Sequence, residues 1–427
     1  MLRLLLALAL SLLARPALPS EAEQRKSTSP LGASAVGASG AIAAGLGGPA
    51  APLGLRVEHM PSPRGVGARP RLSWRLAHPE RAQVVGGYNI SVEQRLGPQR
   101  TSEVWAHSQP VHHGSGLDPL GVVYAGAPLS PDSEYSWRVQ VWDGKGRVSP
   151  WSNRSTFVTG LFSDSDWSGA AWIGMSGPLD DANQFRKVFS VPAKPPLWRC
   201  SMIISGLGYF VAHLGGERVS DHELGESTQF ESQLPYSALD CTAAASPALA
   251  AAGDGDGGGG GANTTGLAVG VELGRGWYAE QLVGALGNQP SGERMLRMLV
   301  TLTYADGQRV ALVSDGSWRR AAGPIIDEQL HLGIVYDARR ETPGWTKSTF
   351  DDTHWKAPDL TSMQRSPALR NAQLTAMIHP SIRKTRTVTP RSLTPTVENT
   401  WLLELPQNIA VRPGQIRSPA AWTLLRG

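Results

Sequence analysis

The sequence predicts an all-β protein made of two β-sandwiches in tandem, followed by the start of a third, incomplete β unit. Its 427 residues are 41% apolar, which is enough to fill more than one core. Its 48 Gly and 32 Pro, with 14 Trp against 7 Phe, favour many turns between short, aromatic-rich strands. Several segments also place large apolar residues at every second position, which is typical of a strand with one face on a core.

The first 51 residues lie outside this β pattern. Arg3 is followed by an apolar run that ends at Leu13, which is too short to span a bilayer, so residues 1–20 are predicted to be a secretory signal peptide. An apolar N-terminal helix is the alternative. Residues 21–51 are rich in Ser, Ala and Gly and are predicted to be a low-complexity leader. The mature chain is therefore expected to be secreted or extracytoplasmic, without a membrane span.

Net charge and cysteine content limit which binding partners and which cellular compartment are expected. The net charge of +4 is small and the basic residues are scattered, which argues against nucleic acid or anionic membranes as partners. Cys200 and Cys241 can form one disulfide in an oxidising compartment, but the sequence leaves open whether they meet. Asn89, Asn153 and Asn263 begin Asn-x-Ser/Thr sequences and are candidate glycosylation sites, although each match can arise by chance. The oligomeric state is not predicted.

Residues 52–160 are predicted to form the first sandwich. The strongest strand covers Tyr135 to Trp142, where large residues alternate with Ser136, Arg138 and Gln140, and a hairpin turn follows at Asp143-Gly144. With the turn before Tyr135, this segment resembles a fibronectin type III-like domain, which implies architecture only. The expected strands are Leu53–Val57, Arg71–Arg75, Tyr88–Glu93, Val104–His107, Val122–Tyr124, Glu134–Trp142 and Ser155–Thr159.

Residues 161–358 are predicted to form a second, jelly-roll β-sandwich. About eight antiparallel strands at this spacing suggest that fold. Residues 242–265, Ala-rich and then Gly-rich, are predicted to be a flexible loop insertion, and no phosphate loop is expected there because no Lys-Ser or Lys-Thr follows. The clearest strands are Lys187–Val191, Cys200–Ile204, Tyr209–His213, Leu267–Val271, Leu296–Leu302 and Val310–Leu312.

The pattern thins in residues 359–427. Ala372–Ala376 and Trp401–Leu405 are predicted to be the first strands of the incomplete third sandwich. Just before it, the segment Leu332–Trp355 is crowded with charged and aromatic residues around Pro343-Gly344, so it cannot be a plain helix or strand. We expect this segment to clasp the jelly roll, with Asp337 and Arg339 in a local ion pair.

Eight motifs in series carry a family resemblance. They are Trp167–Gly174, Arg186–Phe189, Gly206–Tyr209, Gly274–Tyr278, Tyr304–Gly307, Ser314–Trp318, Gly323–Ile325 and Tyr336–Arg339. In this order they resemble the N-terminal β domains of bacterial-type α-L-rhamnosidases, over roughly Pro52 to Asn408. The resemblance implies hydrolysis of terminal α-L-rhamnose by an inverting mechanism, which needs an acid and a base on opposite sides of the sugar.

The resemblance places those catalytic carboxylates on a helical toroid that follows the β domains. No helix-period segment of useful length follows Asp359, so no catalytic residue is expected in this chain. The rival hypothesis is a carboxylate pair within the β block. Neighbouring residues on an extended segment point to opposite sides, which suits such a pair poorly. The candidate pairs are Asp180-Asp181, Asp327-Glu328 and Asp351-Asp352.

Sugar binding is the chemistry that the resemblance leaves open. Jelly rolls of this family can hold calcium against sugar hydroxyls through an Asp-Asn pair and an Asn in a Gly-Asn-Gly-Trp-Tyr turn, and calcium takes such oxygen ligands. Here Asp221 is kept, but His222 and Arg275 replace the two Asn residues, and Arg offers no lone pair. Calcium is therefore disfavoured and no other cofactor is expected. The candidate carbohydrate-binding residues are Asp221, His222, Glu223, Arg275, Trp277 and Tyr278, although Trp277 and Tyr278 can equally fill the core.

Three functional hypotheses follow. The leading one is the non-catalytic N-terminal portion of an α-L-rhamnosidase, which binds a rhamnose-containing glycan or acts as a scaffold. The second is a truncated form or incomplete gene model of an active secreted α-L-rhamnosidase. The third is a cell-surface adhesion module, because tandem sandwiches without catalysis often serve adhesion.

Overall fold

The computed structural model describes residues 47–111, 121–175, 182–193, 195–222, 225, 227–253, 264–279, 292–330, 333–361, 369–397 and 400–407. These residues belong to one compact unit, Leu46–Gly427. The predicted signal peptide, most of the predicted leader, Glu223, Asn263 and the Asp180-Asp181 pair lie outside the described residues. Within the described ranges, no helix is long and apolar enough to cross a membrane.

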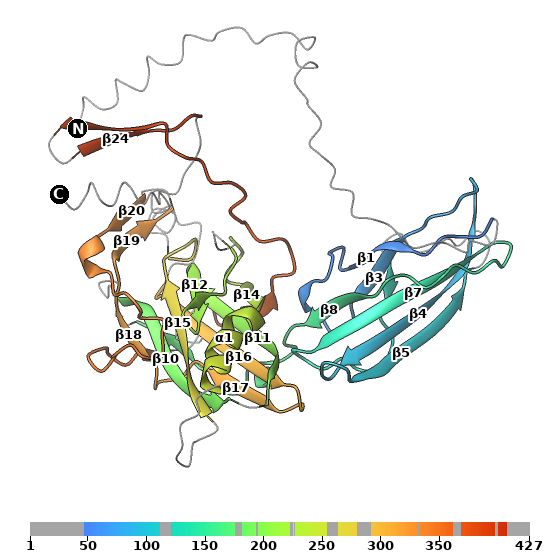
Figure 1. Ribbon diagram of the computed structural model, residues 1–427, viewed down its shortest axis with the longest axis horizontal. Coiled ribbons are helices and arrows are strands. Elements are labelled where there is room, and N and C mark those ends of the chain that lie inside the picture. Colours follow the sequence, from blue (N-terminus) through green and yellow to red (C-terminus); the bar gives the residue numbers. More distant parts are fainter. Residues whose placement is uncertain are drawn as a thin grey trace, which may run out of the picture. The chain divides into compact units, whose positions relative to one another are not determined.

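The first domain is a sandwich of two sheets, as predicted. One sheet has the order β1 (Leu53–Val57), β3 (Arg71–Arg75), β6 (Val122–Val123). The other has the order β2 (Arg64–Val66), β8 (Ser155–Thr159), β7 (Glu134–Asp143), β4 (Val85–Arg95), β5 (Thr101–Pro110). Figure 1 shows β7, β4 and β5 side by side. Only β2 was not predicted, because three residues are too short to show an alternating pattern.

The alternating side chains of β7 hold the two sheets of this domain together. Tyr135, Trp137 and Val139 are buried on one face, and Trp137 packs edge-on against Trp74 of β3, with 6.5 Å between ring centroids. The hydroxyl of Tyr135 accepts a hydrogen bond from the backbone N–H of Ser130 at 2.8 Å. A Tyr that bonds to backbone a few residues upstream fixes the corner between the two sheets.

The second domain is also a two-sheet sandwich. The five-stranded sheet has the order β13 (Glu217–Arg218), β12 (Phe210–Leu214), β15 (Thr264–Leu273), β10 (Ala182–Pro192), β18 (Arg319–Ala322). The seven-stranded sheet has the path β21 (Asp359–Thr361), β9 (Trp172–Gly174), β16 (Met295–Tyr304), β11 (Leu197–Leu207), β14 (Gln233–Asp240), β22 (Gln373–Ala376), with β17 (Arg309–Val313) beside β16. Apolar residues from both sheets form one buried core. The six strands predicted here are confirmed, whereas β14, interrupted by Pro235, was not predicted.

The prediction of a loop insertion at residues 242–265 is wrong over its first half. Helix α1 (Thr242–Gly253) lies beside β11, as Figure 1 shows. Asp240 accepts a hydrogen bond from the first helical N–H, and Ala245 and Leu249 are buried in the core. Alanine has the highest intrinsic helix propensity, and docking onto the sandwich stabilises a short helix that would be marginal alone. Strand β15 already begins at Thr264.

The boundary predicted at residue 358 is also moved by the structure. Strand β21 pairs with β9, and β22 pairs in parallel with β14, so both belong to the second domain. The prediction that Ala372–Ala376 opens a third unit is wrong because Leu369 and Ala372 are buried in the second domain's packing. The third unit is represented by the hairpin of β23 (Ser392–Val397) and β24 (Thr400–Glu404).

The turn-rich segment clasps the five-stranded sheet, as expected. Strand β20 (Gly333–Tyr336) pairs with β19 (Ile325–Gln329), and a 3-10 turn (Ala338–Arg340) follows. The predicted ion pair is present, with 2.8 Å between Arg339 Nη2 and Asp337 Oδ2. Further on, the ring of Trp345 lies over Gly270 of β15, where any Cβ would come within 2.8 Å of it.

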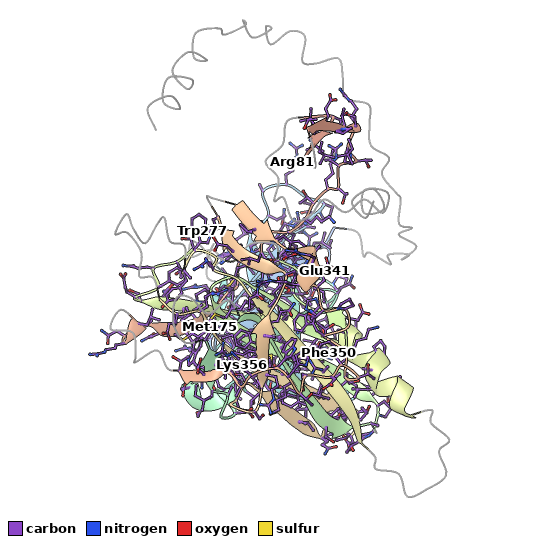
Figure 2. All side chains as sticks on the ribbon, turned by 90° about the vertical axis from the view of Figure 1, so that its left-hand side faces the viewer. Arg81, Met175, Trp277, Glu341, Phe350 and Lys356 are labelled. Atoms are coloured by element: carbon purple, nitrogen blue, oxygen red, sulfur yellow. A yellow bond between two sulfur atoms is a disulfide. The ribbon has the colours of Figure 1, made fainter. Side chains whose placement is uncertain are left out.

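Arg186 of β10 is the centre of this clasp. Its guanidinium donates to the backbone oxygens of Trp345 at 2.7 Å and Lys347 at 2.9 Å, and it pairs with the carboxylate of Asp352. It also lies over the ring of Phe350, which is labelled in Figure 2. The Arg186 side chain is fully buried, so these polar contacts replace its hydration.

Replacing Arg186 with lysine is expected to destabilise the second domain by about 2 kcal/mol. Lysine keeps the charge, but a single ammonium group cannot reach all the acceptors that the planar fork of arginine reaches. Urea unfolding followed by tryptophan fluorescence would measure the loss. A Lys187→Arg substitution, on the same strand, is the matched control and is expected to change stability by less than about 1 kcal/mol, because Lys187 pairs with a half-exposed Asp315. Equal losses in the two variants would contradict the assigned role of Arg186.

The two cysteines form a disulfide, which settles the question that the sequence left open. Cys200 lies on β11 and Cys241 lies just before α1, with 4.9 Å between their Cα atoms. Both side chains are buried, and the N–H of Cys241 donates to the carbonyl of Cys200 at 3.1 Å. The bridge therefore anchors the start of α1 to the seven-stranded sheet.

Polar contacts join the two sandwiches. The buried carboxylate of Asp132, from the turn before β7, accepts from Arg199 of β11 at 2.7 Å and from Arg309 of β17 at 3.2 Å. The hydroxyl of Tyr236 on β14 accepts from the N–H of Leu161 at 2.9 Å. A Cβ on Gly160 would lie 2.3 Å from that hydroxyl, so the close approach requires glycine. We name Asp132, Arg199, Arg309, Gly160 and Tyr236 the interdomain joint.

Candidate functional site

The structure places two of the predicted turns beside Tyr209, which lies between β11 and β12. Its N–H and carbonyl both bond to Gly274, next to Arg275. Its hydroxyl donates to the carbonyl of His222 at 3.1 Å, and its ring lies edge-on to the His222 ring. The 221–222 turn and the 274–278 turn therefore share one neighbour, although they lie more than 50 residues apart in the sequence.

Tyr278 fills the core and offers no free face to a sugar. Its side chain is 1% exposed and packs edge-on against Phe230, with 5.3 Å between ring centroids. Trp277 is half-buried against the same cluster and is labelled in Figure 2. The core-filling alternative therefore describes Tyr278, and only part of the Trp277 ring is accessible.

Arg275 is held by two carboxylates of β19. Its Nε donates to Asp327 at 3.0 Å and its backbone N–H donates to Glu328 at 2.9 Å. Although burial opposes the shift, hydrogen bonds from Gln329 and Arg275 hold the pKa of Asp327 below its usual value. The guanidinium thus neutralises acidic groups at the position where the family would place a calcium ligand.

The described residues do not fit a calcium ion. Arg275 places a positive charge in the turn, His222 is buried between aromatic rings, and the Asp221 carboxylate is already paired with Arg383. Calcium needs six to eight oxygen ligands at about 2.3–2.6 Å. No group of three or more His, Cys, Asp or Glu able to hold a metal exists among the residues that the structure describes.

Asp221 and His222 have different environments. His222 is 3% exposed and lies edge-on to Phe210, with 4.8 Å between ring centroids. The side chain of Asp221 is 47% exposed and forms an ion pair with Arg383, with 2.6 Å between Oδ2 and Nη2. Ser381 contributes a longer contact to Asp221 at 3.5 Å. Among the predicted residues that the structure describes, Asp221 and His222 border an accessible space, and Asp221 offers a half-exposed carboxylate to it.

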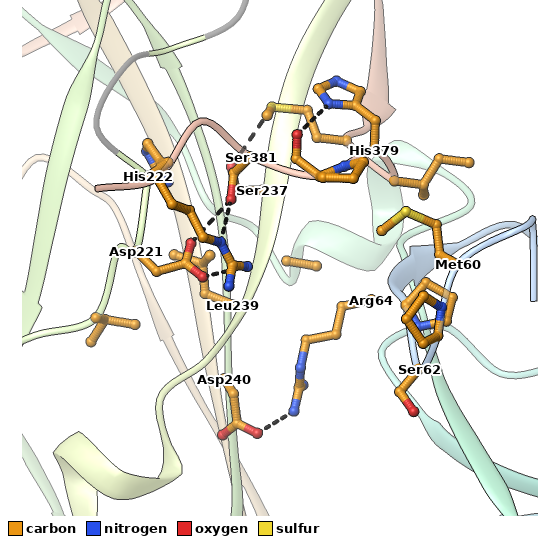
Figure 3. A pocket seen from close by; sticks show the side chains of 18 residues that line it. Met60, Ser62, Arg64, Asp221, His222, Ser237, Leu239, Asp240, His379 and Ser381 are labelled. Carbon is orange, nitrogen blue, oxygen red and sulfur yellow. Dashed lines mark hydrogen bonds and ion pairs between the residues drawn. The ribbon is translucent and has the colours of Figure 1, made fainter. Parts of the chain in front are cut away.

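That space is a pocket of about 450 Å³, shown in Figure 3. Its lining comes from residues 60–64 of the first domain, the 219–222 turn and residues 237–240 of the second domain, and residues 377–383 after β22. Two ion pairs lie in its wall, Asp221 with Arg383 and Asp240 with Arg64. The two positive charges balance the two negative ones, and Ser237 and Ser381 add hydroxyl groups.

Most of this pocket has no signal in the sequence. Arg64 and Asp240 are 176 residues apart, and neither belongs to a recognisable motif. Arg383 lies in a segment without strand periodicity. Only the fold of both domains and the path of the chain after β22 bring these side chains together.

The two described carboxylate pairs are engaged by partners within the chain. Asp352 pairs with Arg186, whereas Asp351 accepts from the N–H of Thr353 two residues on. Asp327 accepts from the guanidinium of Arg275, and Glu328 accepts from the backbone N–H of Arg275. Neither pair lines the pocket.

The two described glycosylation candidates differ in their surroundings. Asn153 is exposed in the loop before β8. Asn89 lies in the middle of β4, and its amide donates to Gln140 of β7 at 3.1 Å. A glycan on Asn89 would have to break that cross-strand contact, whereas Asn153 is accessible without rearrangement.

Comparisons with known proteins give a consistent result. The family model described as "Rha78A-like, N-terminal immunoglobulin domain" matches residues 52–163, and "Alpha-L-rhamnosidase N-terminal domain" matches residues 260–386. An α-L-rhamnosidase of Formosa agariphila is 26% identical over 372 residues, covering 80% of this chain and 36% of the relative. One of Streptomyces avermitilis is 30% identical over 245 residues, covering 57% of this chain and 22% of the relative.

A solved structure agrees with these matches. An α-L-rhamnosidase from Dictyoglumus thermophilum superposes with a TM-score of 0.66 at 27% identity, covering 84% of this chain and 38% of that structure. This chain therefore spans about a third or less of the curated relatives' length, and the matched part is their N-terminal region.

Proposed function

We propose that this chain binds a rhamnose-containing glycan in the pocket beside Asp221. The proposal proceeds from the match of this chain to the N-terminal, non-catalytic region of bacterial-type α-L-rhamnosidases. The pocket carries the proposal, because it is the accessible space that one of the candidate sugar-binding residues faces. The choice of rhamnose rests on the similarity to α-L-rhamnosidases. The interdomain joint supports an additional role as a scaffold that keeps the two sandwiches in one orientation.

The chemistry of the pocket suits a neutral polyol. A sugar hydroxyl both donates and accepts hydrogen bonds, and an arginine–carboxylate pair offers donors and acceptors side by side. The balanced charge of the lining favours neither an anion nor a cation. A volume of about 450 Å³ lies within the usual range of small-molecule sites, which is about 300–1,000 Å³. Pro61, Pro63 and Met377 supply apolar surface for the C–H face of a sugar ring.

We also infer that the protein is secreted. The apolar N-terminal run supports this location, and the buried disulfide is consistent with it because disulfides persist in oxidising compartments. Hydrolysis is not part of this proposal, because the two carboxylates that line the pocket, Asp221 and Asp240, are each paired with an arginine.

Replacing Asp221 with asparagine is expected to weaken rhamnose binding by roughly tenfold or more, because a charged hydrogen-bond acceptor is lost. Isothermal titration calorimetry with L-rhamnose and with rhamnose-terminated oligosaccharides measures the change. Asp315→Asn is the matched control, since Asp315 is also a half-exposed carboxylate paired with a basic residue but lies outside the pocket. We expect that control to bind as the unmodified chain does.

Two results would overturn the proposal. If no rhamnoside gives heat with the unmodified chain, the chain is a scaffold without a sugar site. If Asp221→Asn binds as well as Asp315→Asn, sugar binds somewhere else, and the partly exposed ring of Trp277 becomes the next position to test. Release of rhamnose from a chromogenic rhamnoside by the purified chain would contradict the absence of catalysis.

A further inference from the structure

The segment between β22 and β23 is an exposed connection without regular secondary structure. Residues 382–387 are all exposed and belong to no helix or strand. No backbone hydrogen bond joins them to another described residue. The segment is anchored at both ends, because the N–H of Met377 donates to Tyr236 and the N–H of Arg391 donates to Glu404. It is an extended tether between two structured parts.

The tether carries three basic residues in four positions, Arg383, Lys384 and Arg386. Arg383 is committed to Asp221 of the pocket. Lys384 and Arg386 have no partner among the described residues, so their side chains are free to enter the specificity pocket of another protein. An endoprotease with an acidic specificity pocket recognises a Lys or Arg side chain on an extended, accessible backbone.

We propose that this tether is a processing site for a trypsin-like endoprotease, which cleaves after Lys384 or Arg386. Hydrolysis breaks the amide bond after the basic residue. Water gives its hydroxyl group to the new carboxyl group of Lys384 or Arg386, and its remaining proton goes to the new amine of Thr385 or Thr387. The products are the two sandwiches with residues 377–384 or 377–386 attached, and a fragment that starts at Thr385 or Thr387 and contains the β23–β24 hairpin.

Exposure of a side chain alone does not create such a site, as Arg339 and Arg340 show. The Arg339 side chain is 89% exposed, yet its N–H donates to the Asp337 carboxylate at 3.0 Å. The N–H of Arg340 donates to the carbonyl of Asp337, and that of Glu341 to the carbonyl of Ala338. A protease must straighten this turn before it can bind it, whereas residues 382–387 need no local unfolding.

Cleavage is expected to leave the pocket intact. The Asp221–Arg383 pair lies on the N-terminal side of both cut sites, so residues 377–383 remain in the pocket wall after hydrolysis. The inference is independent of sugar binding, because it rests on the tether and not on the ligand.

Limited digestion of the full chain with trypsin, followed by intact-mass measurement, tests the proposal. Among the residues that the structure describes, we expect the first cut after Lys384 or Arg386. An Arg383→Gln, Lys384→Gln, Arg386→Gln triple variant is expected to slow the first cut among these residues by roughly tenfold or more. A first cut after any other described Lys or Arg, or an unchanged rate in the triple variant, would overturn the proposal.

Thermolysin provides a second measurement that does not depend on the basic residues. It cleaves before large apolar residues, and the tether contains Ile382 and Val388. Among the described residues we expect its first cut before one of these two, at the same rate in the unmodified chain and the triple variant. A first thermolysin cut at a described residue of either sandwich would show that the sandwich backbone is more accessible than the tether backbone, and would refute the inference.

Discussion

Replacing Asp132 with alanine is expected to lower the free energy of unfolding by about 3–5 kcal/mol, because it leaves a buried guanidinium without its carboxylate. The Arg199 side chain is 7% exposed and that of Asp132 is 3% exposed, so water cannot take the place of the lost partner. Urea unfolding followed by fluorescence gives the free-energy change. Differential scanning calorimetry is expected to show two transitions in place of one, as the two sandwiches lose their coupling.

The backbone conformation of Asp132 makes Asp132→Ala more destabilising than the loss of the carboxylate charge alone would be. Its backbone has φ of 43°, a left-handed conformation that Asp and Asn tolerate better than Ala does. Its carbonyl also accepts from Arg199 Nη1 at 3.0 Å, so distortion of the turn weakens a second contact of the joint. Asp132→Asn keeps the backbone preference and one hydrogen-bond acceptor, and is therefore expected to cost less than Asp132→Ala.

Lys145→Ala is the control for loss of an ion pair without burial. The Lys145 side chain is 62% exposed and pairs with a Glu80 side chain that is 36% exposed. Exposed pairs contribute about 0–1 kcal/mol, so this variant is expected to stay within that range. If Asp132→Ala were no more destabilising than Lys145→Ala, the interdomain joint would not couple the two sandwiches.

The sequence predicted the strands of both sandwiches well because burial of one face leaves a direct mark. In β7, each inward position from Tyr135 to Val141 is apolar, and the intervening Arg138 and Gln140 are only partly buried. Strand β16 is buried at every position and so lacks alternation. It was still recognised as a strand, because its run of Leu, Met and Val is too long to be a turn. Strand propensity and alternation are local properties, so they can be read without knowing the fold.

The errors arose where tertiary contacts decide the structure. Residues 242–253 contain so few large side chains that they gave no helical stripe, and their docking through Ala245 and Leu249 decides the outcome. Strand β22 is only four residues long, and its assignment depends on which neighbour has an open edge. No local pattern specifies a parallel partner more than 130 residues away, so the domain boundary was placed too early.

The candidate site also combines a residue that the sequence predicted with residues that it did not. Asp221 was predicted through a family motif, and it does line a pocket. Tyr278 was chosen by a second motif of the same family but is buried, since a motif does not state which side of a turn faces the core. The partners Arg64, Asp240 and Arg383 come from segments of different domains or connections, and charge pairing across such distances leaves no spacing in the sequence.

Loss of the Cys200–Cys241 disulfide is the other large effect that we expect. The two cysteines are 41 residues apart, and the loop-entropy relation gives about 4 kcal/mol of stabilisation for a closed loop of this length. A Cys200→Ala, Cys241→Ala double variant is therefore expected to unfold roughly 10 °C lower. Scanning calorimetry, or thermal unfolding followed by circular dichroism, measures the shift. Alanine is preferred to serine here because a hydroxyl group at these buried positions would add an unsatisfied polar atom.

Reductant separates the effect of the bridge from the effect of losing two sulfur atoms. The unmodified chain is expected to lose most of the 4 kcal/mol when it is unfolded and refolded in dithiothreitol, whereas the double alanine variant should not respond. Two reactive thiols in the denatured, unreduced protein would show that the bridge is not formed. Because Cys241 immediately precedes α1, reduction should also expose the helix to hydrogen exchange sooner than β11 and β16, whose ladders do not depend on the bridge. Loss of protection spread equally over all three elements would show that the disulfide stabilises the sandwich as a whole and not the docking of α1.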